Sequence, residues 1–133
     1  MKINGFQKMT MLDFPDKLAC TVFTPGCNWR CPFCHNARLV THIEAADAWE
    51  EQEIFSYLQK RQGVLEGVCI TGGEPLMQPD FTAAFLRALH EAGLHTCMET
   101  SGFAAQAVLA KAAQDTDLFL FDFKQSDPAL HRR

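Results

Sequence analysis

The sequence lacks the features that direct a chain to a membrane or to a polyanion. It has no apolar run of about 20 residues, the length that crosses a bilayer. Residues 1–5 lack the apolar segment of a signal peptide, so we expect a cytoplasmic protein. The net charge of −4 gives no support for binding to nucleic acid or to an anionic membrane surface. Internal repeats and low-complexity tracts are also missing, and the 47% of hydrophobic residues suffices for one ordinary core.

A second group of neighbouring cysteines is missing as well. Of the 6 cysteines, those that fall singly in apolar stretches are expected to be small buried hydrophobic residues: Cys20, Cys69 and Cys97. A reducing cytosol keeps thiols free, so we do not expect disulfide bonds. The other cysteines crowd together within residues 27–34, and no further cluster is expected beyond the one that they form.

These crowded cysteines are Cys27, Cys31 and Cys34, with the spacing C-x3-C-x2-C. Thiolates are soft ligands that select zinc, copper(I) or iron–sulfur centres. A structural zinc site closes with four protein ligands, so His35 or His42 would have to supply the fourth. A cubane iron–sulfur cluster held by three thiolates keeps one iron open for a substrate. The spacing predicts a metal centre and leaves both kinds open at this point.

The hydrophobic pattern predicts an α/β fold. Near-continuous apolar runs indicate parallel strands covered on both faces, at residues 18–23, 68–71, 94–99 and 118–123. Helical periodicity indicates the connecting helices, at residues 48–62, 80–92 and 104–114. Asp47 and Asp80 are the expected caps of the first two helices, and Gly63 and Gly93 the expected stops. Residues 1–16 end in a turn, and their pattern predicts no regular element. Because a βα unit takes about 30 residues, we expect the 133 residues to form one domain of about four such units.

Each predicted strand leads directly into residues that can hold a ligand. The first strand leads to the cysteines. The other three lead, in order, to Gly72-Gly73-Glu74-Pro75, Glu99-Thr100-Ser101-Gly102 and Asp122-Phe123-Lys124. The carboxyl ends of parallel strands meet at one edge of a sheet, and ligands bind there. The sequence therefore predicts one cofactor pocket shared by all four strand ends.

These motifs resemble those of the radical S-adenosylmethionine (radical SAM) superfamily, whose signature is C-x3-C-x2-C after an apolar strand. Residues 5–15 and 23–36 are similar to activating proteins of glycyl-radical enzymes, especially those of anaerobic ribonucleoside-triphosphate reductase, with pyruvate formate-lyase activating enzymes as close kin. The resemblance implies a 4Fe-4S cluster on Cys27, Cys31 and Cys34 that cleaves S-adenosylmethionine reductively. The resulting 5′-deoxyadenosyl radical would create a glycyl radical on the partner enzyme, with flavodoxin or ferredoxin as electron donor.

The resemblance also assigns residues near the cluster. Gly72, Gly73 and Glu74 match the family's GGE motif, which binds the amino group of S-adenosylmethionine. Two glycines would let the backbone approach the methionine part closely, although a strand-ending turn is the alternative. Phe33 stands where many members carry an aromatic residue, so we expect it against the adenine or, alternatively, in the core.

A second set of assignments follows the last two strands. Glu99 and Thr100 match the acidic-Thr step that holds S-adenosylmethionine and, in the pyruvate formate-lyase branch, a monovalent cation, and Ser101 beside them is assigned to the same cofactor. The alternative is that Thr100 and Ser101 cap the next helix. Asp122 and Lys124 match a D-x-K step, in which they bind polar groups of the cofactor, and an internal ion pair is the alternative.

The length of the chain bears on the expected fold and function. The family fold is a partial parallel barrel of about six βα units, so we expect C-terminal units to be missing from residues 1–133. Two other functions stay open. One is a radical SAM enzyme that acts on a small molecule, as 7-carboxy-7-deazaguanine synthase does. The other is an inactive metal-binding fragment, since lost βα units would expose an edge of the sheet.

Overall fold

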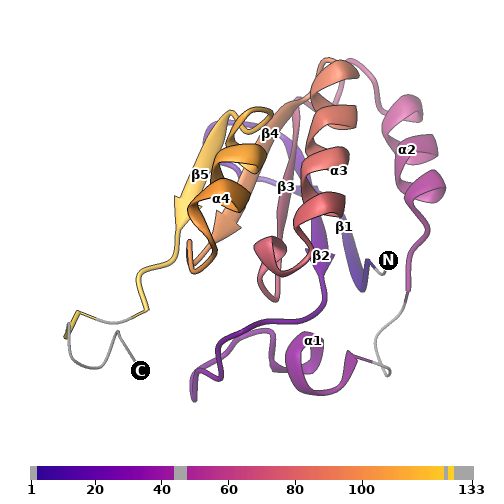
Figure 1. The fold of residues 1–133 in the computed structure, drawn as a ribbon. Coiled ribbons are helices and arrows are strands. Elements are labelled where there is room, and N and C mark those ends of the chain that lie inside the picture. Colours follow the sequence, from indigo (N-terminus) through magenta and orange to yellow (C-terminus); the bar gives the residue numbers. More distant parts are fainter. Residues whose placement is uncertain (1–2, 44–47, 125, 128–133) are drawn as a thin grey trace.

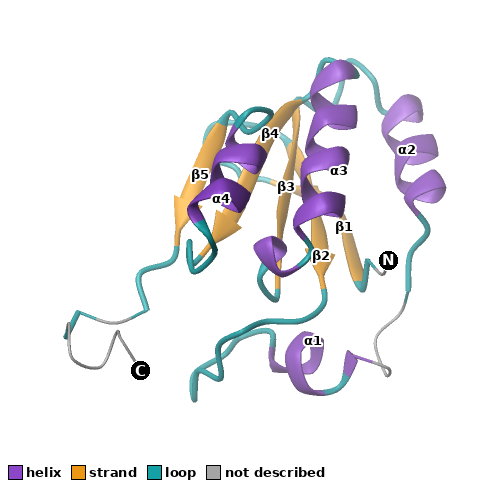
Figure 2. Ribbon diagram, in the orientation of Figure 1, coloured by secondary structure: helices purple, strands orange, loops and turns teal. Residues whose placement is uncertain are grey.

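The computed structural model describes residues 3–43, 48–124 and 126–127, and in them it shows one sheet with helices packed on it (Figures 1 and 2). The strands are β1 Gly5–Thr10, β2 Ala19–Thr24, β3 Gly67–Gly72, β4 His95–Thr100 and β5 Leu118–Phe121. The helices are α1 Ala37–Thr41, α2 Glu51–Lys60, the 3-10 turn η2 Pro75–Met77, α3 Pro79–Glu91 and α4 Gln106–Ala113. No helix among the described residues is both long enough and apolar enough to cross a membrane.

The order of the strands in the sheet follows the order of the chain, β1-β2-β3-β4-β5. Strands β2 to β5 are parallel, and β1 pairs antiparallel with β2. The sheet is open, so the predicted α/β fold, a partial parallel barrel, is confirmed. β1 was not predicted, because this edge strand exposes Gln7, Lys8 and Met9 and so lacks a clear apolar alternation.

The parallel strands are buried on both faces, as predicted. On the face covered by α2, α3 and α4, the strands contribute Cys20, Val22, Val68, Ile70 and Met98 to the main core (Figure 1). On the opposite face, Ala19 of β2, Cys69 of β3 and Cys97 of β4 pack under Phe14. The three predicted hydrophobic cysteines are each 0% exposed, which confirms their structural role.

The helix caps differ from the predicted ones. Asp47 lies outside the described residues, and α2 begins after Glu50, whose side chain forms a capping box with Glu53. The predicted cap Asp80 lies instead inside the first turn of α3, which begins at Pro79. Pro is favoured there because the first turn leaves its backbone N–H groups without helical partners. At the other end, Gly93 follows α3 with a positive φ of 77°, as predicted for a stop.

Candidate functional site

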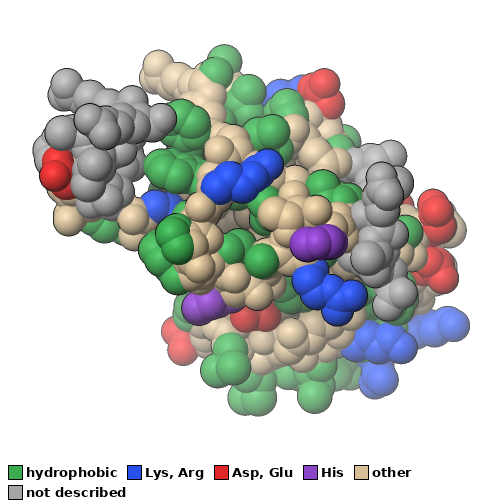
Figure 3. Space-filling view, turned by 90° about the horizontal axis from the view of Figure 1, so that it is seen from below, with side chains coloured by type: hydrophobic (Ala, Val, Ile, Leu, Met, Phe, Trp, Pro, Cys, Tyr) green, Lys and Arg blue, Asp and Glu red, His purple; other side chains and the backbone are tan. Residues whose placement is uncertain are grey.

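The cysteine loop, residues 25–36, runs below the carboxyl ends of β2 to β5, and an open cavity of about 190 Å³ lies between them. Figure 3 looks at this end of the molecule, where hydrophobic, basic and histidine side chains are interspersed. All the residues assigned to the site from sequence line this one cavity: Cys27, Cys31, Phe33, Cys34, Gly72, Gly73, Glu74, Glu99, Thr100, Ser101, Asp122 and Lys124. The structure therefore brings the four strand-end motifs together.

The thiols of Cys27, Cys31 and Cys34 are free and partly exposed. Burial raises the pKa of the Cys27 thiol, and the backbone N–H of Trp29, which lies 3.4 Å from its sulfur, opposes that shift. The metal-free thiol is accordingly protonated at neutral pH, and binding of a metal centre releases its proton.

The donor set of the cysteine loop decides which metal centre fits. His35 lines the same cavity as the three cysteines and His42 does not, and among the described residues no three His, Cys, Asp or Glu side chains are gathered around one ion-sized point. Three thiols around an open cavity are the ligands of a 4Fe-4S cluster that keeps one iron accessible. The residues therefore fit such a cluster.

The two glycines after β3 pack against the start of the cysteine loop, backbone on backbone. The N–H of Gly73 donates to the carbonyl of Thr24 at 2.7 Å, and the N–H of Glu74 donates to that of Gly26 at 2.7 Å. A Cβ atom on Gly73 would lie 2.0 Å from the Gly26 carbonyl oxygen, and Gly72 has a φ of +113°. The glycine pair is thus required by the chain itself, independently of any cofactor.

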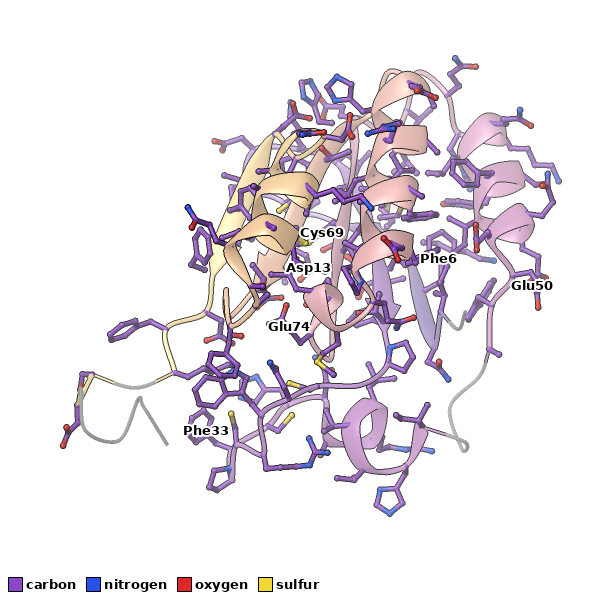
Figure 4. The ribbon with its side chains drawn as sticks, viewed as in Figure 1. Phe6, Asp13, Phe33, Glu50, Cys69 and Glu74 are labelled. Atoms are coloured by element: carbon purple, nitrogen blue, oxygen red, sulfur yellow. The ribbon has the colours of Figure 1, made fainter. Side chains whose placement is uncertain are left out.

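The carboxylate of Glu74 is buried behind this turn, with 2% of the residue exposed (Figure 4). Its Oε1 accepts hydrogen bonds from the Thr100 hydroxyl at 2.5 Å and from the Leu76 N–H at 3.1 Å. Its Oε2 accepts from the hydroxyl and the N–H of Ser101, at 2.7 and 2.9 Å. Thr100 and Ser101 therefore bind Glu74 and do not cap α4, whose cap is Ala105, so that alternative was wrong.

The remaining charged residues of the cavity lie at the ends of β4 and β5. Glu99 is partly buried and accepts a hydrogen bond from the Thr71 hydroxyl at 2.5 Å. Asp122 and Lys124 form the ion pair predicted as the alternative to cofactor binding. Partial burial opposes the charge of Lys124, but the hydrogen bond and the charge of Asp122 outweigh it and raise the pKa of the ammonium group. Lys124 therefore stays cationic at neutral pH.

Sequence reasoning missed part of the lining of the cavity. The additional residues are Trp29, His35, Asn36, Val40 and Thr71. Thr71 was detectable, because alternation from Ile70 places it on the other face of β3, just before the glycines. Trp29 could be suspected because it lies in the cysteine loop, but the position of its ring depends on a turn far away in the sequence. Phe33 lines the cavity and is 63% exposed, which excludes the alternative that it belongs to the core.

Comparisons with known proteins agree with the geometry. Residues 21–133 match the family model described as the radical SAM superfamily. The chain is 30% identical over 138 residues to pyruvate formate-lyase 1-activating enzyme of Escherichia coli (strain K12), covering 98% of this chain and 55% of that protein. It is 33% identical over 141 residues to the pyruvate formate-lyase-activating enzyme of Listeria monocytogenes (serovar 1/2a), covering 98% and 56%.

A shorter match extends the range of similar proteins. Over 65 residues the chain is 49% identical to the choline trimethylamine-lyase activating enzyme of Oleidesulfovibrio alaskensis, covering 49% of this chain and 21% of that protein. The chain spans about half the length of the pyruvate formate-lyase activating enzymes, although nearly all of its own residues are matched. The family model, matched over residues 21–133, shows that this chain belongs to the radical SAM superfamily, whose cofactors are a 4Fe-4S cluster and S-adenosylmethionine.

Proposed function

We propose that the protein is an activating enzyme that creates a glycyl radical on a partner enzyme. The observation that carries this proposal is the convergence of three free thiols and the motifs of β3, β4 and β5 on one cavity. When bound, the cluster and S-adenosylmethionine supply a one-electron reductive cleavage of a C–S bond. The protein supplies the ligands, the orientation and the exclusion of water.

Each group of residues then has a stated task. Cys27, Cys31 and Cys34 hold the cluster, and the backbone at Gly72 and Gly73 receives the amino group of S-adenosylmethionine. Two charged residues at the strand ends bind the carboxylate and the ammonium group of S-adenosylmethionine. The Lys124 ammonium, which stays charged, attracts the carboxylate. The Glu99 carboxylate attracts the ammonium of the methionine part.

The outer residues of the cavity have two further tasks in this proposal. Phe33, exposed at the cavity, stacks on the adenine. Glu99, Thr100, Ser101 and Asp122 line the same cavity, and the carboxylate oxygens of Glu99 and Asp122 are hard ligands of the kind that a monovalent cation prefers.

The partner that we propose is an anaerobic ribonucleoside-triphosphate reductase. The reason for this choice is the resemblance inferred from the sequence motifs in residues 5–15 and 23–36. The names of the matched relatives refer instead to pyruvate formate-lyase and choline trimethylamine-lyase, so both kinds of partner enter the test. A reduced flavodoxin or ferredoxin is the proposed electron donor, and the cytoplasm is the proposed location.

The test uses the full 133-residue chain, reconstituted with iron and sulfide without oxygen. Dithionite, S-adenosylmethionine and one candidate partner are added, and electron paramagnetic resonance is recorded. A glycyl doublet with the ribonucleotide reductase supports the proposal, and a doublet with pyruvate formate-lyase alone changes the partner. The Cys31→Ala variant is the control that must give no signal.

Two other outcomes reject the proposal in different ways. If 5′-deoxyadenosine forms with a metabolite and without any protein partner, the protein acts on a small molecule. If the protein stays colourless after reconstitution with iron and sulfide but binds added zinc, the chain is a metal-binding fragment without this chemistry.

A further inference from the structure

We infer that Glu74 is a positioning residue and not a ligand of the cofactor, and that it holds Trp29 of the cysteine loop through the hydroxyl group of Ser101. The inference deepens the proposed function, on which it rests for the use of the loop as the holder of the cluster. It concerns three side chains, Glu74, Ser101 and Trp29, from three different segments of the cavity wall. We call their linked hydrogen bonds the Glu74 relay.

The first step is the saturation of the Glu74 carboxylate. A carboxylate has about four acceptor positions, and the chain itself fills four of them at Glu74, two on each oxygen. Only 2% of the residue is exposed. Glu99 is the useful contrast, because among the described residues its carboxylate accepts one hydrogen bond, from Thr71, and it stays partly exposed. Glu99 therefore keeps acceptor positions for a ligand, and Glu74 does not.

The second step is the hydroxyl group of Ser101, which is equally saturated. It donates to Glu74 Oε2 at 2.7 Å. It accepts from the indole Nε1–H of Trp29 at 3.1 Å and from the backbone N–H of Phe103 at 3.4 Å. A serine hydroxyl has one donor and two acceptor positions, so all three are used. The buried carboxylate fixes the direction of the hydroxyl, and the hydroxyl then presents its acceptor positions to Trp29.

The third step is the position of Trp29 in the cysteine loop, between Cys27 and Cys31. Its ring also packs edge-on against Phe103, with 5.4 Å between ring centroids. The neighbouring Asn28 donates its side-chain N–H to the carbonyl of Phe103 at 2.9 Å. The middle of the loop is thus attached to the turn after β4, while its start is attached to the turn after β3 through Gly26 and Glu74.

The consequence is that two of the three thiols are placed before any cluster is bound. Trp29 and Asn28 lie directly between Cys27 and Cys31, so a loop released from Ser101 can move both thiols away from the cavity. A loop that is already ordered in the metal-free chain loses less conformational entropy when the cluster binds. The Glu74 relay therefore increases the affinity of the loop for its cluster without touching it.

The relay is testable in the metal-free chain, because the protein has 2 tryptophans and the Trp49→Phe change leaves Trp29 as the sole reporter. In that background, acrylamide quenching of Trp29 emission is compared with and without Ser101→Ala. Of the three hydrogen bonds that this change removes, the neutral one to the Trp29 indole holds the loop, and its loss alone shifts the population of the held loop by about two- to tenfold, so we expect stronger quenching and a red-shifted emission. Ser101→Thr keeps the hydroxyl and should restore the parent values.

Ser56→Ala is the matched control, since among the described residues its hydroxyl makes one hydrogen bond, to the Gln52 carbonyl at 2.7 Å within α2. It should leave Trp29 unchanged. Equal quenching in the parent and in Ser101→Ala, or an equal effect of Ser56→Ala, would overturn the inference.

The second readout is the rate at which a chelator removes iron from the loaded protein. Trp29→Phe keeps an aromatic ring beside Phe103 but loses the N–H donor, so we expect extraction to be about two- to tenfold faster. This variant also serves if Ser101→Ala does not fold. Unchanged extraction from Trp29→Phe would reject the relay. Neither measurement uses a partner enzyme. Failure of the proposed function, seen as a missing glycyl doublet, can therefore be told apart from failure of the relay, seen as an unchanged Trp29 signal.

Discussion

A methyl group added at Gly73 should separate the cysteine loop from the strand ends. The new Cβ would lie 2.0 Å from the carbonyl oxygen and 2.7 Å from the carbonyl carbon of Gly26, and both are backbone atoms without rotational freedom. Relief requires the two segments to part, which breaks the hydrogen bonds from Gly73 to Thr24 and from Glu74 to Gly26. Each bond contributes about 1 kcal/mol, and forcing packed segments apart costs about 1–3 kcal/mol more. We therefore expect Gly73→Ala to lower the free energy of unfolding by about 3–5 kcal/mol.

The assay is urea unfolding of the metal-free chain followed by circular dichroism, together with iron uptake on reconstitution. Gly93→Ala is the matched control, because it has the left-handed φ of +77° but no atom within 4 Å of its added Cβ. The control should lose only about 1–2 kcal/mol from backbone conformation and should load iron normally. A Gly73→Ala protein within about 0.5 kcal/mol of the parent, with full iron uptake, would refute the reasoning.

Three further predictions follow from the same structure. Iodoacetamide applied to the native, metal-free chain should label only the thiols of the cysteine loop. Cys20, Cys69 and Cys97 are 0% exposed, and burial raises the pKa of the Cys20 thiol to about 12. A modified Cys97 found by mass spectrometry before unfolding would contradict this prediction. The backbone N–H of Thr96 lowers the pKa of Asp117, so that carboxylate stabilises the fold above about pH 4 and loses its effect as the pH falls. Asp117→Asn should therefore cost about 1 kcal/mol at pH 7, after allowance for solvent screening, and the difference from the parent should shrink in acid-unfolding curves as the pH falls below about 4. Glu99→Gln should weaken binding of S-adenosylmethionine to the loaded protein by about tenfold in calorimetry with unchanged stability, and an unchanged dissociation constant would remove Glu99 from the site.

The buried part of the fold was predictable because each parallel strand has its own apolar run. Strands β2 to β5 and helices α2, α3 and α4 were expected from such runs and from helical periodicity, whereas the short α1 was not. The antiparallel β1 was not, because an edge strand is specified by its partner, through pairs such as Phe6 with Val22, more than by its own pattern. Cap positions were also missed, because the capping box of Glu50 with Glu53 lacks the Ser or Thr that usually marks a helix start in a sequence.

The candidate site also has a predictable and an unpredictable part. The membership of the cavity was predictable, because the ends of parallel strands must meet at one edge, and all assigned residues do line it. The tasks of individual residues were harder to predict. Glu74 looks like a cofactor ligand in the sequence, and only the partners Thr100 and Ser101, brought close by the pairing of β3 with β4, show that its acceptor positions are filled. Contacts between distant segments carry no local sequence signal.

The long separation between Trp29 and Ser101, 72 residues along the chain, has a consequence for biosynthesis. At about 5–20 residues per second, a ribosome needs several seconds to deliver the second of these residues after the first. During that interval the nascent thiols have emerged without the turn that holds them. Before β4 has been translated, iron and sulfide would encounter a cysteine loop that Ser101 does not yet hold. We therefore expect the metal centre to assemble after this strand has been synthesised.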